Sequence, residues 1–532
     1  MSRISLLTKN GNALPLLTTA EKEAGKALLK DLQLDKVLWL LCPEAAPRQA
    51  LTDALCRSAV QPEDIRFRGQ VQALFAAHPT LLEDLLGISL RLGQTKNAWD
   101  ADRSRLLSGR RTNPSDIQLQ LSVSRDVLGL TCMYLRSFIS QIRELSQVLA
   151  AYPDSAKVLA VFRENCDRVW RGQTELVEFA DRCHRMLNQA TRYRLEVMLD
   201  PTLYTHGYIL QDFTYLRQNG GKPGSRDTQK DKGSLLSLLG RKSKDNGEKR
   251  TVGVPTETGK PLSHPMDITR QMELTQAAVA ECDRYLTAML RRLLDRFSQL
   301  EDELYFYTGA LQIRQALLEK GVPAIYPTIT PSSTGTITIT GLYDLLLLSG
   351  TTKDRVVPND VVLSCEAQGL TTQGKHRLPG MLIHGENNSG KTVFLRSVGT
   401  AILFAQCGLP IPATDGTISI RKRLYTQFAT AEGKLVSGST AGRFEEEAAA
   451  LARMLDDMEP DSLFLLNETF QTTAYGEGAA GIAPILRYIG DCGGAFVFVT
   501  HLTALLSTME EQVVIAKTSD RPETKYKVFI EK

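Results

Sequence analysis

The chain lacks any long hydrophobic run and any leader-like start. None of its apolar stretches approaches the ~18 residues that a membrane-spanning helix needs. The opening segment, Met1 to Ser5, has no apolar centre of the kind found in a signal peptide. We therefore expect a soluble, cytoplasmic protein that does not have a membrane as a partner.

Cysteine pairs are also missing. The nine cysteines are scattered, their number is odd, and no two of them form a C-x-x-C motif. This usage predicts reduced thiols and no structural zinc. The net charge of +3 is too small to argue for or against a nucleic-acid partner, because the distribution of charge decides that question.

The amino-terminal part of the 532-residue chain has helical patterns, and its length predicts two to four domains. Residues 1–62 are expected to be mainly helical, with Thr18 to Glu21 as a capping box. Residues 63–322 are expected to form a helical lever domain, because helical patterns extend over 115–150 and 155–200. From Asp267 to Thr308, apolar residues recur at steps of three and four, which predicts one rod of about forty residues and about 60 Å.

Residues 219–265 interrupt the helical region with a segment rich in Gly, Pro, Ser and Lys. Between Lys222 and Arg250 there are nine basic and four acidic residues. Such composition is typical of a flexible insertion. Two interpretations stay open: a solvated linker, or a basic tip that contacts nucleic-acid phosphates.

After Gly321 the pattern changes to period two and short apolar runs, which predicts an α/β domain over 323–532. Within it, Gly385 to Thr392 fits G-x-x-x-x-G-K-[ST], the phosphate-binding loop. An apolar strand pattern precedes the motif and a helical pattern follows it, as the motif requires. The eight residues of this candidate ATP site are Gly385, Glu386, Asn387, Asn388, Ser389, Gly390, Lys391 and Thr392.

Each part of this motif has a chemical task. The glycines let backbone N–H groups turn toward phosphate oxygens, and the helix start adds the positive end of its dipole. Lys391 is expected to reach the β- and γ-phosphates, and the Thr392 hydroxyl is expected to bind Mg²⁺. The motif therefore predicts ATP and Mg²⁺ as ligands.

Two further strand patterns end in polar pairs. The strand from Asp461 ends in Asn467 and Glu468, and the strand from Ala495 is followed by His501. We expect Asn467 near the Mg²⁺, Glu468 to activate the attacking water, and His501 to contact the γ-phosphate. Asn467 is neutral and therefore a weaker Mg²⁺ partner than a carboxylate.

Ser439 lies at a predicted helix start that is rich in small residues and followed by three acidic residues. Simple helix capping explains this composition. The alternative is an anion site for a γ-phosphate that another subunit presents.

These pieces, in this order, resemble the ATPase domain of the MutS family of DNA mismatch-repair proteins. The similarity covers about 340–515 and is weaker in the helical half. The matching segments are 358–360, Asn387, 404–413, 424–426, 439–447, 466–468 and 499–502. The resemblance implies an ABC-like P-loop fold, a homodimer that sandwiches two ATP molecules, Ser439 acting from the partner, and a lever that moves a DNA clamp.

The chain also departs from the family pattern. The amino-terminal mismatch-recognition domain and the terminal dimerisation segment are expected to be absent, and the clamp to be reduced to 219–265. Glu386, Asn388, Ser389 and Asn467 replace the family's usual residues. The predicted fold is multidomain, an all-α lever region followed by an α/β P-loop NTPase domain.

The predicted function is ATP hydrolysis at a dimer interface, coupled to DNA binding in mismatch repair or recombination. The alternative is a nucleotide-switched interaction protein that acts on a protein or on ribosomal RNA. A transporter- or cohesin-type ATPase would need an LSGGQ-like signature, and the sequence contains none.

Overall fold

The structure is a computed structural model, and it describes most of the chain. The described residues are 3–57, 61–108, 116–188, 191–199, 205–215, 265–332, 335–363, 377–428, 443–470, 475–519 and 521–531. The chain forms two compact units. Unit 1 comprises Met1–Ile4 and Glu83–Glu301, and unit 2 comprises Ser5–Leu82 and Asp302–Lys532. The expected division into 1–62, 63–322 and 323–532 stays a prediction, and these two units cross its boundaries.

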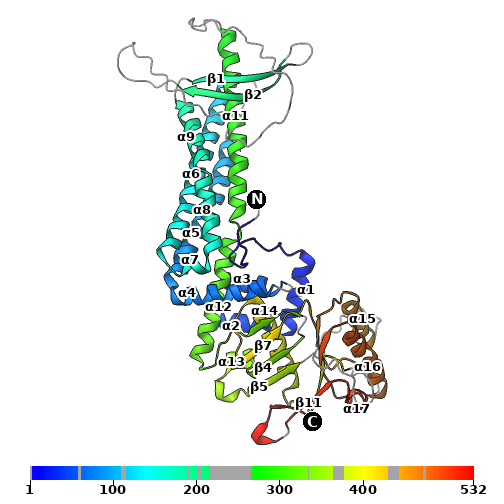
Figure 1. Ribbon diagram of the computed structural model, residues 1–532. Helices are drawn as coiled ribbons and strands as arrows, with labels where there is room; N and C mark the ends of the chain where they lie inside the picture. The colour runs from blue at the N-terminus through cyan, green and yellow to red at the C-terminus, as the bar shows by residue number, and fades with distance from the viewer. Residues whose placement is uncertain are drawn as a thin grey trace. The chain divides into compact units, whose positions relative to one another are not determined.

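Unit 1 is built from long helices and one strand pair (Figure 1). Its elements are α5 (Pro79–Ser108, which starts in unit 2), α6 (Ile117–Ala151), α7 (Ser155–Val158), α8 (Ala160–Gly172), α9 (Thr174–Asn188), β1 (Thr191–Leu199), β2 (Thr205–Tyr215) and α11 (Pro265–Arg296). Helices α6 and α11 lie side by side. The Phe138 ring of α6 also contacts the Phe297 ring, which comes directly after α11, and the two ring centroids are 5.9 Å apart. The helical expectation for this region is confirmed in its main part.

A polar cluster crosses the interior of unit 1. Asp283 on α11 accepts two hydrogen bonds from the Arg103 guanidinium of α5, at 3.0 and 2.7 Å. It also accepts a hydrogen bond from the Thr131 hydroxyl of α6 at 2.8 Å. Because the bidentate pair is mostly buried, it fixes the register of three helices by charge as well as by packing.

Two expectations for this region were wrong. The helical pattern over 155–200 ends at Asn188, and β1 pairs with β2 in an antiparallel ribbon. The sequence of β1 has apolar residues at every second position from Tyr193 to Leu199, which is the period of a strand. The rod expected from Asp267 to Thr308 is also divided, because α11 ends at Arg296 and α12 (Leu300–Glu319) begins after a short turn.

Apolar residues are buried on both sides of the turn between α11 and α12. Leu293, Phe297, Leu300 and Leu304 are all buried. No glycine or proline lies in the turn, so the pattern gave no sign of the break. The predicted basic segment 219–265 lies outside the described residues, except for Pro265, where α11 begins.

Unit 2 holds an α/β core. Its elements before the sheets are α1 (Thr19–Asp31), α2 (Leu34–Leu41), α3 (Ala45–Leu55), α4 (Pro62–Ala77) and α12. Its strands are β3 (Thr328–Thr330), β4 (Ile337–Leu342), β5 (Asn359–Leu363), β6 (Gly380–His384), β7 (Asp415–Ser419), β8 (Leu424–Phe428), β9 (Leu463–Asn467), β10 (Ala495–Val499), β11 (Val514–Thr518) and β12 (Val528–Ile530). The later helices are α13 (Leu345–Gly350), α14 (Lys391–Cys407), α15 (Arg443–Asp456), α16 (Tyr475–Asp491) and α17 (Thr503–Met509), with short 3₁₀ turns η2 (Lys353–Arg355) and η3 (Pro522–Thr524).

The main sheet of unit 2 has six strands in the order β12-β11-β6-β10-β9-β8. Strands β11, β6, β10, β9 and β8 are parallel, and β12 is antiparallel to β11. Strands β9 and β10 are buried along their whole length, as expected for a parallel sheet covered on both faces. Helix α14 packs on β9 and β10, while α16 and α17 contribute to an apolar core that includes Phe464 and Phe496.

A second sheet, with the order β3-β7-β4-β5, completes unit 2. The expectation of a helical region followed by an α/β region is therefore confirmed. So is the capping box, because the Thr18 hydroxyl accepts from the Glu21 N–H and the Glu21 carboxylate accepts from the Thr18 N–H. Within the described ranges, no single helix has the length and apolar content needed to cross a membrane. Helices α4 and α5, which are bent relative to each other, reach that length and apolar content only when they are counted together.

The carboxyl end of α14 is held by two buried side chains of α4. The Arg68 guanidinium donates to the Cys407 carbonyl at 3.0 Å, and the Gln72 amide donates to the Gly408 carbonyl at 2.5 Å. The last carbonyls of a helix have no partner within the helix, so these contacts satisfy them. Arg68 also lies over the Phe306 ring of α12.

Candidate functional site

The candidate site lies where four neighbouring parallel strands end. In the sheet register, Val499 of β10 lies opposite both Asn467 of β9 and Ile383 of β6. On the other side of β6, Lys517 of β11 lies opposite His384. The carboxyl ends of parallel strands meet at one edge of a sheet, where ligands of such folds bind. The structure thus brings the polar residues predicted after β6, β9 and β10 to a single edge.

The loop from Gly385 to Gly390 joins β6 to α14 and has left-handed backbone at three positions. Gly385 has φ 144°, Asn388 has φ 59° and Gly390 has φ 93°. A Cβ at Gly385 would lie 1.9 Å from the Thr518 hydroxyl, so only glycine fits there. Asparagine tolerates the left-handed region better than most residues. The sequence of the loop is therefore explained by its backbone.

The side chains of the loop divide into an outer and an inner group. Glu386, Asn387 and Asn388 are exposed, whereas Ser389 is buried. The Ser389 hydroxyl accepts a hydrogen bond of 2.6 Å from the Thr518 hydroxyl at the end of β11. This bond anchors the loop to the neighbouring strand.

Lys391 is the first residue of α14, and its side chain turns back toward the loop. Its ammonium group donates to the carbonyls of Gly385 at 2.9 Å and Glu386 at 2.6 Å. Burial lowers the pKa of Lys391, and the nearby negative charge of Glu468 raises it in part. A cation is thus held under the loop backbone, close to a carboxylate.

Thr392 and Asn467, which the sequence predicted as a metal-binding pair, are in direct contact. The Thr392 hydroxyl donates to the Asn467 side-chain oxygen at 3.0 Å. Both groups offer neutral oxygen atoms, and oxygen is what Mg²⁺ prefers in proteins. The pair fits a magnesium ion that takes its negative ligands from phosphate and its further neutral ligands from water.

Glu468 and His501 are also brought together. The Glu468 carboxylate lies 3.3 Å from His501 Nε2. This is within ion-pair distance, although the angles do not meet those of a hydrogen bond, since Nε2 has no hydrogen-bond partner among the described residues. Glu468 has left-handed backbone with φ 58°, and its N–H donates to the Val499 carbonyl at 2.9 Å. The backbone bond therefore fixes the carboxylate at the sheet edge.

Ser439 lies outside the described residues, so its predicted role stays a prediction. The following helix is described, and Glu447 of α15 accepts a hydrogen bond of 2.8 Å from the Phe470 N–H. This contact joins α15 to the segment after Glu468. The sequence pattern indicates only an acidic residue near a helix start at Glu447, and it gives no sign of this bridging contact.

Two other residues at this edge were missed. Asn359 of β5 lies in the family-like segment 358–360, and no motif in the sequence includes Tyr526. The Asn359 side chain donates to the Tyr526 carbonyl at 3.1 Å and accepts from the Val528 N–H at 2.8 Å. The distance of more than 160 residues between them left no local signal for this contact.

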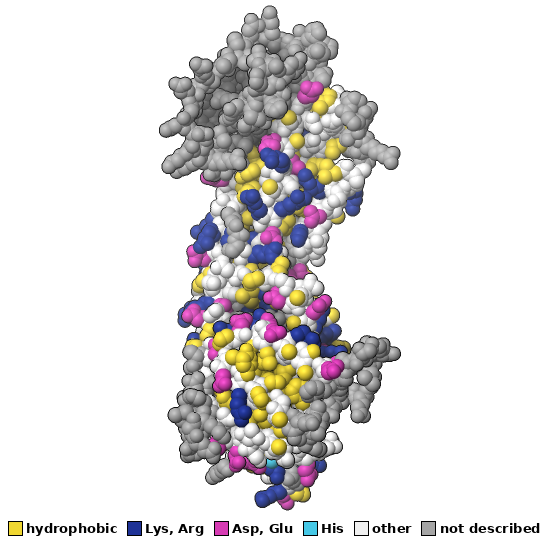
Figure 2. Space-filling model, turned by 90° about the vertical axis from the view of Figure 1, so that its right-hand side faces the viewer, with side chains coloured by type: hydrophobic (Ala, Val, Ile, Leu, Met, Phe, Trp, Pro, Cys, Tyr) yellow, Lys and Arg dark blue, Asp and Glu magenta, His cyan; other side chains and the backbone are white. Residues whose placement is uncertain are grey.

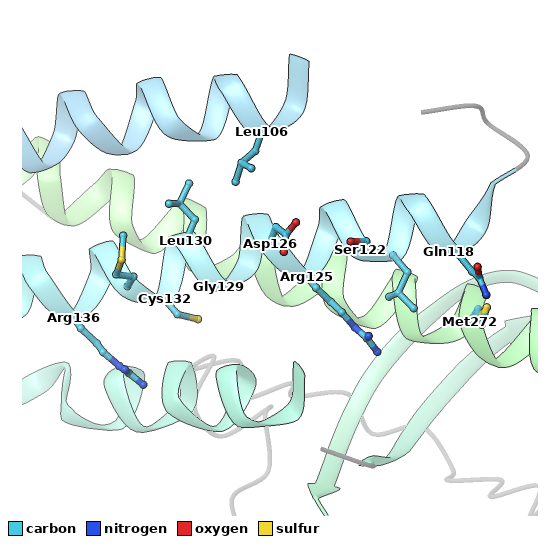
Figure 3. A pocket seen from close by; sticks show the side chains of 12 residues that line it. Leu106, Gln118, Ser122, Arg125, Asp126, Gly129, Leu130, Cys132, Arg136 and Met272 are labelled. Atoms are coloured by element: carbon cyan, nitrogen blue, oxygen red, sulfur yellow. The ribbon is translucent and has the colours of Figure 1, made fainter. Parts of the chain in front are cut away.

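A cavity of about 850 Å³ lies in unit 1, beside α5, α6 and α11 (Figure 3). The lining residues are Leu106, Gln118, Leu121, Ser122, Arg125, Asp126, Gly129, Leu130, Cys132, Met133, Arg136 and Met272. Arg125 and Arg136 point to the same side of α6 (Figure 3). Arg136 forms an ion pair with Asp181, whereas Arg125 Nε is buried and has no hydrogen-bond partner among the described residues.

The sheet-edge site therefore has a defined chemistry. It combines a glycine-lined loop at a helix start, a buried cation, two neutral oxygen ligands, and a carboxylate beside an imidazole. Such a set suits a polyphosphate with its metal ion and a water molecule.

The comparisons with known proteins agree with this class of site. Residues 381–529 match the family model of MutS domain V, a segment that runs from β6 to β12. On this match, the region 381–529 belongs to the MutS family, and the relatives that follow carry names of the same family.

Several curated relatives are similar to the chain. It is 36% identical over 126 residues to "Endonuclease MutS2" of Acetivibrio thermocellus, covering 24% of the chain and 16% of the relative. It is 27% identical over 244 residues to "Endonuclease MutS2" of Shouchella clausii, covering 45% and 28%. It is 30% identical over 166 residues to "DNA mismatch repair protein MutS" of Methanococcoides burtonii, covering 30% and 17%. The matches thus span less than a third of the length of each of these relatives.

Proposed function

We propose that the sheet-edge site binds ATP with Mg²⁺ and hydrolyses it to ADP and phosphate. The observation that carries this proposal is the direct contact of Thr392 with Asn467 beside the buried Lys391. In this proposal, loop N–H groups and Lys391 hold the β- and γ-phosphates, and Thr392 and Asn467 hold the metal ion. When bound, Mg²⁺ would neutralise phosphate charge that Lys391 alone cannot balance.

Glu468 and His501 divide the remaining tasks in this proposal. The Glu468 carboxylate accepts a proton as water oxygen bonds to the γ-phosphorus and the bond to the β–γ bridging oxygen breaks. His501 donates a hydrogen bond to the γ-phosphate and orients Glu468. Ser439 of a second copy would complete the site, so the working form in this proposal is a homodimer.

A Lys391→Ala variant tests nucleotide binding. We expect ATP affinity to fall by at least about 100-fold, because a charge-assisted contact to a phosphate in a partly buried site is lost. Isothermal titration calorimetry with Mg²⁺ measures this affinity. Lys353→Ala is a matched control, because Lys353 is a lysine at the surface of the same unit that bonds the Gly321 carbonyl. Equal affinity of wild type and Lys391→Ala would refute the site.

We further propose that unit 1 binds DNA. The support is the name of the relative "DNA mismatch repair protein MutS" and the buried Nε of Arg125 in the cavity, which has no hydrogen-bond partner in the part of the chain that the structure describes. Figure 2 shows Lys and Arg side chains interspersed with acidic ones on the visible face of the helical unit. Individual arginines are therefore expected to contribute more than a broad basic patch.

An Arg125→Ala variant tests this second proposal. Phosphate contacts release counterions, so losing one is expected to lower DNA affinity and to reduce the salt slope by about one. Arg284→Ala is a matched control, because Arg284 is exposed and paired with Glu281. Fluorescence anisotropy with homoduplex, mismatched and branched DNA at several salt concentrations measures both quantities. An unchanged slope would contradict the role of Arg125.

The alternative, a nucleotide switch that acts on a protein or on ribosomal RNA, has one observation in its favour. Asn467 is neutral, and a neutral metal partner favours binding over fast turnover. The same DNA panel separates the two functions, because a switch of this kind would bind none of the DNA forms in a salt-dependent way.

A further inference from the structure

The turn that follows β9 contains two residues with left-handed backbone. Glu468 has φ 58° and Phe470 has φ 66°, and the Phe470 ring is buried in an apolar core of unit 2. Bulky side chains rarely adopt this conformation, because their Cβ comes too close to the following carbonyl oxygen. Such backbone persists only where its surroundings hold it, and at the edge of a site it is a reason to look for a functional role.

Glu447 of α15 provides a hydrogen bond that holds the far side of this turn. Its carboxylate accepts from the Phe470 N–H at 2.8 Å, and a hydrogen bond to a charged acceptor is stronger than one between neutral groups. On the near side of the turn, the Glu468 N–H donates to the Val499 carbonyl at 2.9 Å. The Thr469 hydroxyl between them is buried and has no hydrogen-bond partner in the described part of the chain, so this side chain does not fasten the turn.

Glu447 is itself attached to the main sheet. The Gln427 amide of β8 donates to the Glu447 backbone carbonyl at 3.0 Å, and β8 pairs with β9. Leu451 lies one helical turn after Glu447, on the same face of α15, and is buried in the apolar core that also includes Phe470. Glu447 therefore reaches the turn from a helix that is held both by packing and by a backbone contact.

The backbone of the turn determines where the Glu468 carboxylate lies. Glu468 Oε1 is 3.3 Å from His501 Nε2, and a general base must lie within hydrogen-bond reach of the water that it activates. If Phe470 left the left-handed region, the backbone after Glu468 would rotate and the carboxylate would move with it. A displacement of about 1 Å is enough to lower a rate by roughly 100-fold.

We propose that Glu447 is a positioning residue for hydrolysis: its carboxylate holds Phe470 in the left-handed backbone that places the Glu468 carboxylate beside the reacting water. This inference rests on the proposed ATP site and deepens it, because it adds a residue of α15 to the groups at the strand ends. Glu447 acts through the turn and not on the nucleotide. It therefore affects the rate of hydrolysis and leaves the affinity for ATP unchanged.

Two replacements of Glu447 in the full chain test the proposal. Glu447→Met keeps the length and helix propensity of the side chain but removes the acceptor, whereas Glu447→Gln keeps an amide oxygen for the Phe470 N–H. Phosphate release at saturating ATP with Mg²⁺ gives kcat, and isothermal titration calorimetry gives the ATP affinity. We expect kcat of Glu447→Met to fall at least about tenfold with unchanged ATP affinity. Glu447→Gln should stay within about threefold of wild type.

A double variant separates positioning from a general structural role. Glu468→Gln alone and Glu468→Gln combined with Glu447→Met should release phosphate at the same residual rate, because Glu447 acts only through Glu468. Asp456→Met, at an exposed position of α15, is the matched control, since it also replaces an acidic side chain on this helix. It should change neither kcat nor ATP affinity.

The outcomes that contradict the proposal are distinct from those that contradict the ATP site. Unchanged kcat in Glu447→Met, a loss of ATP affinity in that variant, or a further loss of rate in the double variant would overturn the positioning role and leave the ATP site in place. If Glu468→Gln releases phosphate at the wild-type rate, or if wild type does not hydrolyse ATP, the proposed hydrolysis mechanism and the positioning role are both refuted.

Discussion

Glu303 of α12 is expected to make the stability of unit 2 depend on pH. Its carboxylate is 4% exposed and accepts hydrogen bonds from the Ser5 hydroxyl at 2.7 Å and the Leu6 N–H at 2.5 Å. Burial raises the pKa of Glu303 from 4.5 to about 7, although these two bonds and the charges of Arg68 and Arg57 lower it in part.

The size and sign of the effect follow from this pKa. Below pH 4.5 the folded and unfolded chains are both protonated at Glu303, so the full stability is present. As pH rises from 4.5 to about 7, the unfolded chain loses the proton while the folded chain keeps it, so stability falls. A shift from 4.5 to about 7 corresponds to about 3 kcal/mol lost across this range.

A Glu303→Gln variant removes this titration and keeps the shape of the side chain. Its amide oxygen can accept from Leu6, and its NH₂ can donate to the Ser5 hydroxyl. Urea unfolding at pH values from 4.5 to 7.5, followed by circular dichroism, gives the free energy of unfolding of each form. We expect wild type to lose about 3 kcal/mol more than Glu303→Gln over this range.

Glu319→Gln, at an exposed position of the same helix, is the matched control and should follow the wild-type pH profile. If wild type and Glu303→Gln show the same pH dependence, then Glu303 is ionised in the folded protein at pH 5 and the argument from burial is refuted.

Two other predictions concern the sheet-edge site and unit 1. Glu468→Gln should keep ATP affinity while phosphate release slows by at least about 100-fold, as expected for a lost general base; turnover at the wild-type rate would remove Glu468 from this role. Asp283→Ala should destabilise unit 1 by about 3–5 kcal/mol, because it leaves the buried Arg103 guanidinium without its carboxylate. Urea unfolding measures this loss, and a value below about 1 kcal/mol would show that the pair is well solvated.

The site was predictable from the sequence where its parts are local. The loop from Gly385 to Thr392 has fixed spacing, and Asn467, Glu468 and His501 each follow an apolar strand. A parallel sheet brings such strand ends together, so their proximity could be predicted without knowing the strand order. Contacts between residues far apart in the sequence, such as those of Asn359 with Tyr526 and Val528, could not be predicted in this way.

The features that the sequence did not predict have physical causes. The Tyr526 ring lies beside Gly390, and Asn359 bonds the Tyr526 carbonyl. No periodicity links residues so far apart in the sequence. The strand β1 continued a run without glycine or proline, and its period of two was overlooked beside the stronger helical patterns before it. The break before α12 lies in an apolar seam that continues on both sides, so the pattern had no reason to stop there.

The attachment of α14 at both ends has a mechanical consequence. Its 17 residues make a rod of about 25 Å that begins at the phosphate loop and ends against Arg68 and Gln72. Hydrogen bonds weaken steeply with distance and angle. An axial displacement of α14 by about an ångström at the loop would therefore change the hydrogen bonds that Arg68 and Gln72 of α4 make at its other end. If ATP displaces α14, amide hydrogen exchange in residues 62–77 should become slower or faster when ATP is added. Unchanged exchange would mean that α14 does not move.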